Sequence, residues 1–206
     1  MSTKILVAYY SSTGNVHQIA QAVAAGAEST GAEVRLRRAP ELAPAEAVES
    51  NPAWKAHLEA VADVPDVTPD DFVWSEGYAL GTPTRYGTPS AQLKQVIDGL
   101  GPQWQQGLLA NKAATAFVSA SNAHGGNEST LLTLNNVYAH WGAIIVPSGY
   151  TSANPYAAGG NPYGTGYASG GATDTPLPDE YVEAGKAQGA RLAQVARLIA
   201  PLRADR

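Results

Sequence analysis

The stretch ILVAYYSSTGNVHQIA, residues 5–20, decides the fold because it joins an apolar run to an amphipathic segment through a polar break. The run over residues 5–10 is short and β-branched at Ile5 and Val7, which is typical of a strand buried on both faces of a parallel sheet. Apolar residues then recur at helical spacing from Val16 to Ala27. The sequence therefore predicts a strand that leads directly into a helix.

The polar break between this strand and this helix is suited to bind a phosphate. It offers the hydroxyls of Ser11, Ser12 and Thr13, the amide of Asn15, and at Gly14 a backbone that a ligand can approach closely. A helix N-terminus adds unpaired N–H groups and the positive end of its dipole. For this stretch alone, an ordinary N-cap with additional serines is the alternative interpretation.

Two common phosphate-binding motifs are absent from this loop. No GxxxxGK[ST] follows the strand, which argues against a P-loop nucleotide triphosphatase, and no GxGxxG is present, which argues against a dinucleotide fingerprint. The loop also contains no lysine or arginine. We therefore expect hydroxyls and backbone N–H groups to hold a small monophosphate.

Composition narrows the class of protein. A chain of 206 residues fits one α/β domain over residues 1–206, and a net charge of -5 argues against a nucleic-acid surface. The absence of cysteine excludes disulfides, thiolate metal sites and cysteine nucleophiles, and the four histidines lack the spacing of a zinc site, so we expect no metal. Without a signal peptide or a long apolar run, the sequence predicts a cytoplasmic protein with no stable membrane insertion.

Strand-like and helix-like segments alternate along the chain. Further strands are expected at residues 33–38 and 77–81 and from residues 113 and 143, and the last helix at about residues 179–200. This alternation predicts a doubly wound five-stranded parallel sheet with helices on both faces. Residues 39–68 are interpreted as a surface excursion with one short helix, and the Gly- and Tyr-rich residues 150–178 as a functional loop near the active site.

Three loops rich in small residues follow strands of this predicted sheet. They are residues 11–15, residues 81–90 with Arg85 and Tyr86, and residues 119–129. Each loop alone is compatible with ordinary turn chemistry. Because ligands of open α/β sheets bind outside the carboxyl ends of the strands, the three together predict a phosphate seat and two walls for a flat ligand.

Five motifs within and beyond these loops resemble one family. YYSSTGNV, GTPTRYG, AHGGNE, HWGAIIVPSGY and GGNPYG occur in the order and spacing of the WrbA family, which are flavodoxin-like NAD(P)H:quinone oxidoreductases that bind FMN. The resemblance extends from about residue 4 to the C-terminal helix. It implies a flavodoxin-like fold, two-electron reduction of quinones to hydroquinones by NADH or NADPH in a ping-pong mechanism, and a homotetramer.

The resemblance also assigns residues to the FMN site and to the quinone pocket. It implies FMN contacts from the phosphate loop, from the edge and face of the isoalloxazine, from the third loop and from a histidine, and a quinone pocket walled by a tryptophan and a tyrosine. The FMN contacts are Ser11, Ser12, Thr13, Gly14, Asn15, Val16, Pro83, Thr84, Arg85, Tyr86, Gly87, Ser121, Asn122, Ala123, His124, Gly125, Gly126 and His140, and the quinone contacts are Trp104 and Tyr86. Thr13 stands where family members often have a tyrosine linked to nicotinamide binding.

Three of these residues have chemistry of their own to offer. Arg85 is able to stabilise negative charge on a reduced ring or to contact a dinucleotide, or it is a solvated loop arginine. His140 is able to donate a proton to a quinone oxygen as a catalytic residue, or it has a packing role. Trp104, after the segment GLGPQ, is expected in an exposed aromatic wall or a subunit contact.

Two other classes of protein remain as alternatives. A flavodoxin-like carrier transfers single electrons between proteins and needs no substrate pocket, which the long Gly- and Tyr-rich loop and Trp104 argue against. A regulatory protein associated with a repressor is the other alternative. No basic groove or zipper in the sequence supports it.

Overall fold

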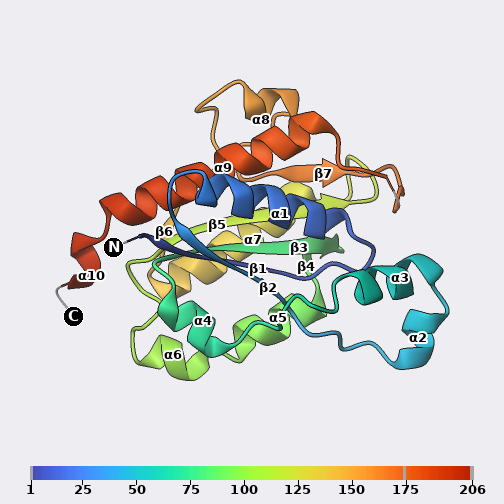
Figure 1. Ribbon diagram of the computed structural model, residues 1–206, viewed down its shortest axis with the longest axis horizontal. Helices are drawn as coiled ribbons and strands as arrows, with labels where there is room; N and C mark the ends of the chain where they lie inside the picture. The colour runs from blue at the N-terminus through green and yellow to red at the C-terminus, as the bar shows by residue number, and fades with distance from the viewer. Residues whose placement is uncertain (1, 174, 205–206) are drawn as a thin grey trace.

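The computed structural model describes residues 2–173 and 175–204 and contains a seven-stranded sheet (Figure 1). Its main path has the order β2-β1-β3-β5-β6, and all neighbours along this path are parallel. The five strands are β1 Lys4–Tyr9, β2 Glu33–Arg38, β3 Gly77–Arg85, β5 Ala113–Ala120 and β6 Ile144–Ile145. The predicted doubly wound parallel sheet is therefore confirmed.

Two short strands extend the predicted five. β4, Thr88–Pro89, pairs with the end of β3 in an antiparallel hairpin, and β7, Gly166–Ala168, runs parallel to the end of β5. β7 and the short helix α8, Asn154–Ala157, both lie in the segment 150–178, which the sequence predicts to be a loop. Residue 174 of that segment lies outside the described residues.

Helices cover both faces of the sheet, as predicted. α1, Asn15–Glu28, and α9, Asp179–Leu198, contribute to one core cluster, while α5, Ala91–Asp98, and α7, Asn127–Trp141, contribute to the other. The side chains of β1 alternate between the two clusters, since Ile5 and Val7 face the first and Leu6 and Ala8 the second. This double burial explains why the first strand is a continuous apolar run.

Two glycines allow α1 and α9 to cross at close range. A Cβ atom added to Gly189 would lie 1.9 Å from the backbone oxygen of Val23, and one added to Gly26 would lie 1.9 Å from that of Lys186. No side chain fits at either position. The long C-terminal helix is thereby held against the helix that follows the phosphate loop.

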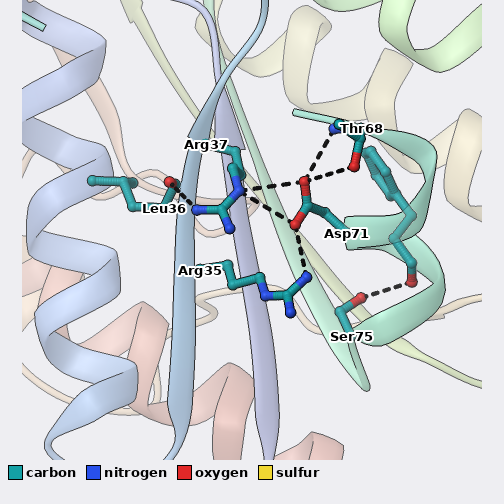
Figure 2. Close-up of polar contacts among 7 residues, drawn as sticks. Arg35, Leu36, Arg37, Thr68, Asp71 and Ser75 are labelled. Carbon is teal, nitrogen blue, oxygen red and sulfur yellow. Dashed lines mark hydrogen bonds and ion pairs between the residues drawn. The ribbon is translucent and has the colours of Figure 1, made fainter. Parts of the chain in front are cut away.

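An ion-pair cluster fixes the edge strand β2 to α4, Pro69–Trp74 (Figure 2). Arg35 and Arg37 donate to the buried carboxylate of Asp71 at 3.0 and 3.3 Å, and the backbone N–H of Thr68 donates to it at 3.0 Å. Burial alone would raise the pKa of Asp71, but the bonds from Thr68 and Arg35 outweigh it and hold the pKa below its usual value. Val34 and Leu36 pack on the core from the other face of the strand.

Four further short segments are helical. α2, Ala45–Glu49, and α3, Pro52–Ala60, lie in the excursion and are drawn at the right of Figure 1, beyond the end of β1. α3 corresponds to the one short helix that the sequence predicts there, and α2 was not predicted. α6, Gly101–Gln105, lies at the opposite end of the sheet, and α10 is Pro201–Ala204. Like α2 and α4, these two are too short for the helical spacing of apolar residues to predict them.

Candidate functional site

The three predicted loops converge on one cleft at the carboxyl end of the sheet. The cleft has a volume of about 230 Å³. It is lined by Ser12, Thr13 and Asn15 of the first loop, Pro83, Thr84 and Arg85 of the second, Ser119, Ala120 and Ser121 of the third, and Ser169, Gly171, Ala172 and Thr173 of the Gly- and Tyr-rich segment. The predicted convergence is confirmed, and the last group adds a fourth wall.

The first loop leaves the N-terminus of α1 without a side-chain cap. Gly14 is the N-cap residue, and its φ of 99° lies in the left-handed region that favours glycine. The hydroxyl of Ser11 accepts from the backbone N–H of Gly14 at 3.1 Å and so shapes the turn before the helix. No serine caps the helix, so the first N–H groups of α1 have no side-chain partner from this loop beside a cleft that Asn15, its first residue, lines.

Asn15 joins the first loop to the fourth wall. Its side-chain N–H donates to the backbone oxygen of Ala172 at 2.8 Å. The other side-chain atom, Oδ1, is buried and has no partner within the described protein. Val16, the next residue, points into the core, so that its contribution to the cleft is limited to its backbone.

Arg85 bridges the first and second loops. Its guanidinium donates to the hydroxyl of Ser12 at 3.4 Å and to the backbone oxygen of Thr84 at 3.0 Å. Of the described residues that line the cleft, only Arg85 carries a charge. Its positive charge at the rim favours an anionic ligand.

Tyr86 and Gly87 form the tip of the hairpin between β3 and β4. Both have positive φ, 53° and 77°, and the side chain of Tyr86 is fully exposed. A tyrosine in the left-handed region is uncommon and strained. This turn conformation places the aromatic ring of Tyr86 in solvent at the end of the second loop, beside the cleft that Arg85 lines.

Glycines form the turns of the third loop, which contacts the second loop. Gly126 has a φ of 97° and begins α7, and a Cβ atom added to it would lie 2.8 Å from Cα of Gly87. Asn122 accepts from the backbone N–H of His124 at 3.0 Å, and its backbone oxygen accepts from Gly125 at 3.0 Å. Ser121 alone of residues 121–126 lines the cleft, while Asn122, Ala123 and His124 are exposed above it.

Trp104 and His140 lie together, but not in this cleft. The indole N–H of Trp104 donates to the backbone oxygen of His140 at 2.9 Å, and both line a second cavity of about 230 Å³. His140 is at the C-terminal end of α7, whose N-terminal end borders the cleft. At about 1.5 Å per residue, the two ends are about 20 Å apart. Within one chain, these two residues therefore do not reach the cleft.

The sequence predicts the segment 150–178 to lie near the active site, but not which of its residues form the fourth wall of the cleft, nor their link to Asn15. The wall is made by small residues, Ser169, Gly171, Ala172 and Thr173, and the link uses a backbone oxygen. Neither leaves a signal in the types of residue. The tyrosines and the motif GGNPYG in the same segment were the available signal that it was functional.

The cleft suits a phosphomonoester attached to a polar chain and a flat ring. Its first loop offers hydroxyls, the uncapped end of α1 and the buried, unpaired Oδ1 of Asn15, and one arginine crosses its rim. Within the described residues, no three His, Cys, Asp or Glu side chains are grouped to hold a metal ion. In the same part of the chain, every helix is too short or too polar to span a bilayer.

Comparison with known proteins gives a consistent result. Residues 1–158 match the model of the family described as NADPH-dependent FMN reductase. The chain is 44% identical over 168 residues to NAD(P)H dehydrogenase (quinone) of Deinococcus radiodurans, covering 82% of this chain and 84% of that protein. It is 39% identical to the protein of the same name from Chelativorans sp., covering 93% and 96%.

Solved structures resemble the fold. The flavodoxin, WrbA-like protein from Agrobacterium tumefaciens superposes with a TM-score of 0.65 at 22% identity, over 96% of this chain and 99% of that one. A flavodoxin from the domain Archaea superposes with a TM-score of 0.61 at 16% identity, over 95% and 99%. At these identities the likeness concerns the fold, which is the flavodoxin-like arrangement of the sheet described above.

Proposed function

Because the chain belongs to the NADPH-dependent FMN reductase family and within it to the WrbA-like proteins, we propose that it is an FMN-dependent NAD(P)H:quinone oxidoreductase. The observation that carries this proposal is the uncapped N-terminus of α1 at a cleft lined by hydroxyls. The reaction is a two-electron reduction of a quinone to a hydroquinone with NADH or NADPH as donor.

The residues of the cleft fit FMN. The hydroxyls of Ser12 and Thr13 and the N–H groups at the start of α1 would hold the phosphate, in a turn that Ser11 shapes, and residues 83–85 and 119–121 would enclose the chain and the ring. When bound, FMN supplies a ring that accepts a hydride from a nicotinamide and passes two electrons to a quinone. The absence of lysine in the first loop agrees with a monophosphate held by N–H and O–H donors.

Arg85 has a defined task at this site. Its bonds to Ser12 and Thr84 keep the guanidinium at the rim, where it stabilises negative charge on a bound ligand. A flavin ring gains such charge when it is reduced, and a dinucleotide carries it already. The same residue therefore supports both steps of the reaction, while the polar walls around it orient the ligand.

A ping-pong mechanism is part of this proposal, and its support is that the described loops share one cleft. The three strand-end loops and the segment 169–173 surround a single space, so the nicotinamide and the quinone would use the same exposed flavin face in turn. A one-electron carrier is the alternative. The names of the curated relatives, which are NAD(P)H dehydrogenase (quinone), favour the enzyme over this carrier and over a repressor-associated regulator.

Trp104 and His140 are proposed to act in the cleft of a neighbouring chain, in a homotetramer. The support is their distance from the cleft of their own chain together with the 53% exposure of Trp104. Tyr150 and Tyr156, 53% and 65% exposed, are stacked with ring centroids 4.5 Å apart on the segment predicted to lie near subunit contacts. Exposed aromatic surface of this kind is typical of interfaces. There Trp104 would wall the quinone pocket with Tyr86, and His140 would hold a proton near the quinone oxygen.

The proposal predicts that the purified apoprotein binds one FMN per chain and that, without oxygen, it oxidises at most one NADH or NADPH per flavin until a quinone is supplied, after which turnover is continuous. Absorbance of the bound flavin gives the stoichiometry, and loss of NADH absorbance gives the turnover. A protein that binds FMN but transfers electrons only to a protein acceptor would establish the carrier instead. A protein that binds no FMN would refute the assignment of the cleft.

A further inference from the structure

The excursion over residues 39–68 contacts the phosphate loop from outside the cleft. Figure 1 shows α2 and α3 at the carboxyl end of the sheet, beside the start of α1. The sequence predicts this segment to be a surface excursion with one short helix, and half of its length is indeed coil. Two of its side chains, Glu41 and His57, nevertheless reach the residues that surround the proposed phosphate seat.

Glu41 fastens the excursion to the end of β1 and to α5. Its carboxylate accepts from the hydroxyl of Tyr10 at 2.8 Å, the indole N–H of Trp54 at 3.0 Å and the amide of Gln92 at 2.8 Å. Tyr10 immediately precedes the phosphate loop. Burial alone would raise the pKa of Glu41, but these bonds and those from two backbone N–H groups outweigh it and keep the pKa below its usual value. The carboxylate of Glu41 therefore stays charged in mild acid.

His57 of α3 packs directly on the turn of the phosphate loop. Its Nδ1 lies 3.6 Å from the position that a Cβ atom on Gly14 would occupy. Its ring also lies against that of His17 on the first turn of α1, with centroids 5.5 Å apart, and His17 shares a hydrogen bond with the hydroxyl of Tyr9. The imidazole of His57 thus contacts the first turn of α1 through His17 and lies beside the N-cap residue Gly14, where it occupies the space next to the missing side chain.

The surroundings of His57 disfavour a charged imidazole. Its Nε2 is buried and has no hydrogen-bond partner within the described residues. The titratable groups that face it are His17 from α1 and, from β2, Arg38, whose guanidinium is bound to Asp66 at 3.0 Å. Burial first, and then the charges of His17 and Arg38, lower the pKa of His57 to about 4. Burial also lowers the pKa of His17.

We propose that residues 39–68 brace the flavin phosphate loop, with neutral His57 as the positioning residue that supports Gly14, and that protonation of His57 releases the brace and weakens binding of the phosphate. The proposal rests on the proposed function in one respect, that FMN is the ligand of this loop. The brace itself is a property of the apoprotein.

The direction of the pH dependence follows from the two states of His57. In the braced state it takes up a proton at a pH of about 4, and in a released state at its ordinary value of 6.5. Between these values the released state binds more protons, so lowering the pH favours release. At pH 5 this difference between the two pKa values shifts the equilibrium from the braced to the released state by up to about thirtyfold. Because the side chain of His57 is partly exposed, solvent screening reduces the expected shift to about tenfold. Above 6.5 both states are neutral and the brace is unaffected by pH.

The test compares FMN binding by the apoprotein at about pH 7.5 and about pH 5 by flavin fluorescence titration in four proteins: the wild type, His57→Leu, His57→Ala and Glu59→Gln. Leucine keeps apolar contact but cannot be protonated, alanine removes the contact, and Glu59 is an exposed residue of the same helix. The second ionisation of a phosphate, near about pH 6, changes binding equally in all four. Differences between their pH profiles therefore report on His57.

The wild type and Glu59→Gln are expected to lose about tenfold more affinity at the lower pH than His57→Leu does. His57→Leu should bind FMN at the higher pH within about threefold of the wild type, and His57→Ala should bind weakly at both pH values. Parallel profiles for the wild type and His57→Leu would overturn the proposal.

A second measurement uses no flavin and so separates this proposal from the assignment of FMN. Amide hydrogen exchange of residues 11–18 in the apoprotein, corrected for the intrinsic effect of pH, should accelerate at the lower pH in the wild type and not in His57→Leu. Unchanged protection of these residues in the wild type would overturn the brace even if FMN binds. Accelerated exchange in a wild type that binds no FMN would support the brace and refute the proposed function.

Discussion

Replacing Gly14 by valine tests whether the backbone of the first loop is what holds the cofactor phosphate. The φ of Gly14 is 99°, and a Cβ atom would lie at an ordinary contact distance of 3.6 Å from Nδ1 of His57. The Cβ atom itself therefore causes no collision, and the penalty worked out here is that of the backbone conformation. For a β-branched residue in such a conformation it is about 1–3 kcal/mol.

In the apoprotein the loop of the valine variant can relax to negative φ, so the strain must be restored when the phosphate binds. At about 1.4 kcal/mol per factor of ten, we expect the Kd for FMN to rise about ten- to hundredfold. Gly31→Val is the matched control, because Gly31 has a φ of 83° with no atom within 4 Å of an added Cβ and follows the far end of α1. Flavin fluorescence titrations give the Kd, and urea unfolding gives the stability of each variant.

The control Gly31→Val should have a lower free energy of unfolding than the wild type but the same Kd for FMN. An unchanged Kd in Gly14→Val would place the phosphate elsewhere. Equal losses of FMN affinity in the two variants would show that general destabilisation, and not the geometry of the phosphate loop, controls binding. Either result would refute the reasoning from the conformation of Gly14.

Three further predictions concern the frame around the site and the second cavity. Gly189→Ala should lower the free energy of unfolding by about 2–4 kcal/mol, because its Cβ atom would overlap the backbone oxygen of Val23; urea denaturation measures this, and a loss below about 0.5 kcal/mol would contradict the close crossing. Asp71→Asn should lower it by about 2 kcal/mol at neutral pH. The pKa of Asp71 in the folded protein lies below its ordinary value. The contribution of the carboxylate to stability is therefore present above the ordinary pKa and is lost as the pH falls through the folded pKa, so the stabilities of the two proteins should converge in acid. A difference in stability that does not depend on pH would be inconsistent with this role of Asp71. Trp104→Ala should raise the quinone KM and leave the Kd for FMN unchanged in steady-state assays, and unaltered quinone kinetics would remove Trp104 from the pocket.

The fold was predictable from sequence because the three central strands β1, β3 and β5 are apolar segments buried on both faces and each main helix shows an apolar stripe. β1 is the clearest case, since successive residues enter opposite core clusters. The three-residue strand β7 and the five-residue helix α6 carry no such pattern and are defined by their partners in the structure. The sequence also predicted that three loops meet, because parallel strands bring their carboxyl ends to one edge.

Contacts between distant segments were not predictable in the same way. Glu41 lies among acidic and alanine residues that look solvated, yet it accepts from Tyr10, Trp54 and Gln92. His57 and Gly14 are far apart in the sequence, and their contact depends on the path of the whole excursion. The distance of Trp104 and His140 from the cleft follows from the length and direction of α7, which residue types do not reveal.

A single-turnover experiment tests the central claim most directly. The apoprotein is loaded with FMN, freed of oxygen and mixed with NADH or NADPH in the absence of quinone, and the flavin absorbance is followed before and after a quinone is added. We expect one donor molecule to bleach one bound flavin fully, and one quinone then to restore the absorbance and yield one hydroquinone. Bleaching that requires the quinone to be present, or that stops at one electron per flavin, would contradict the account.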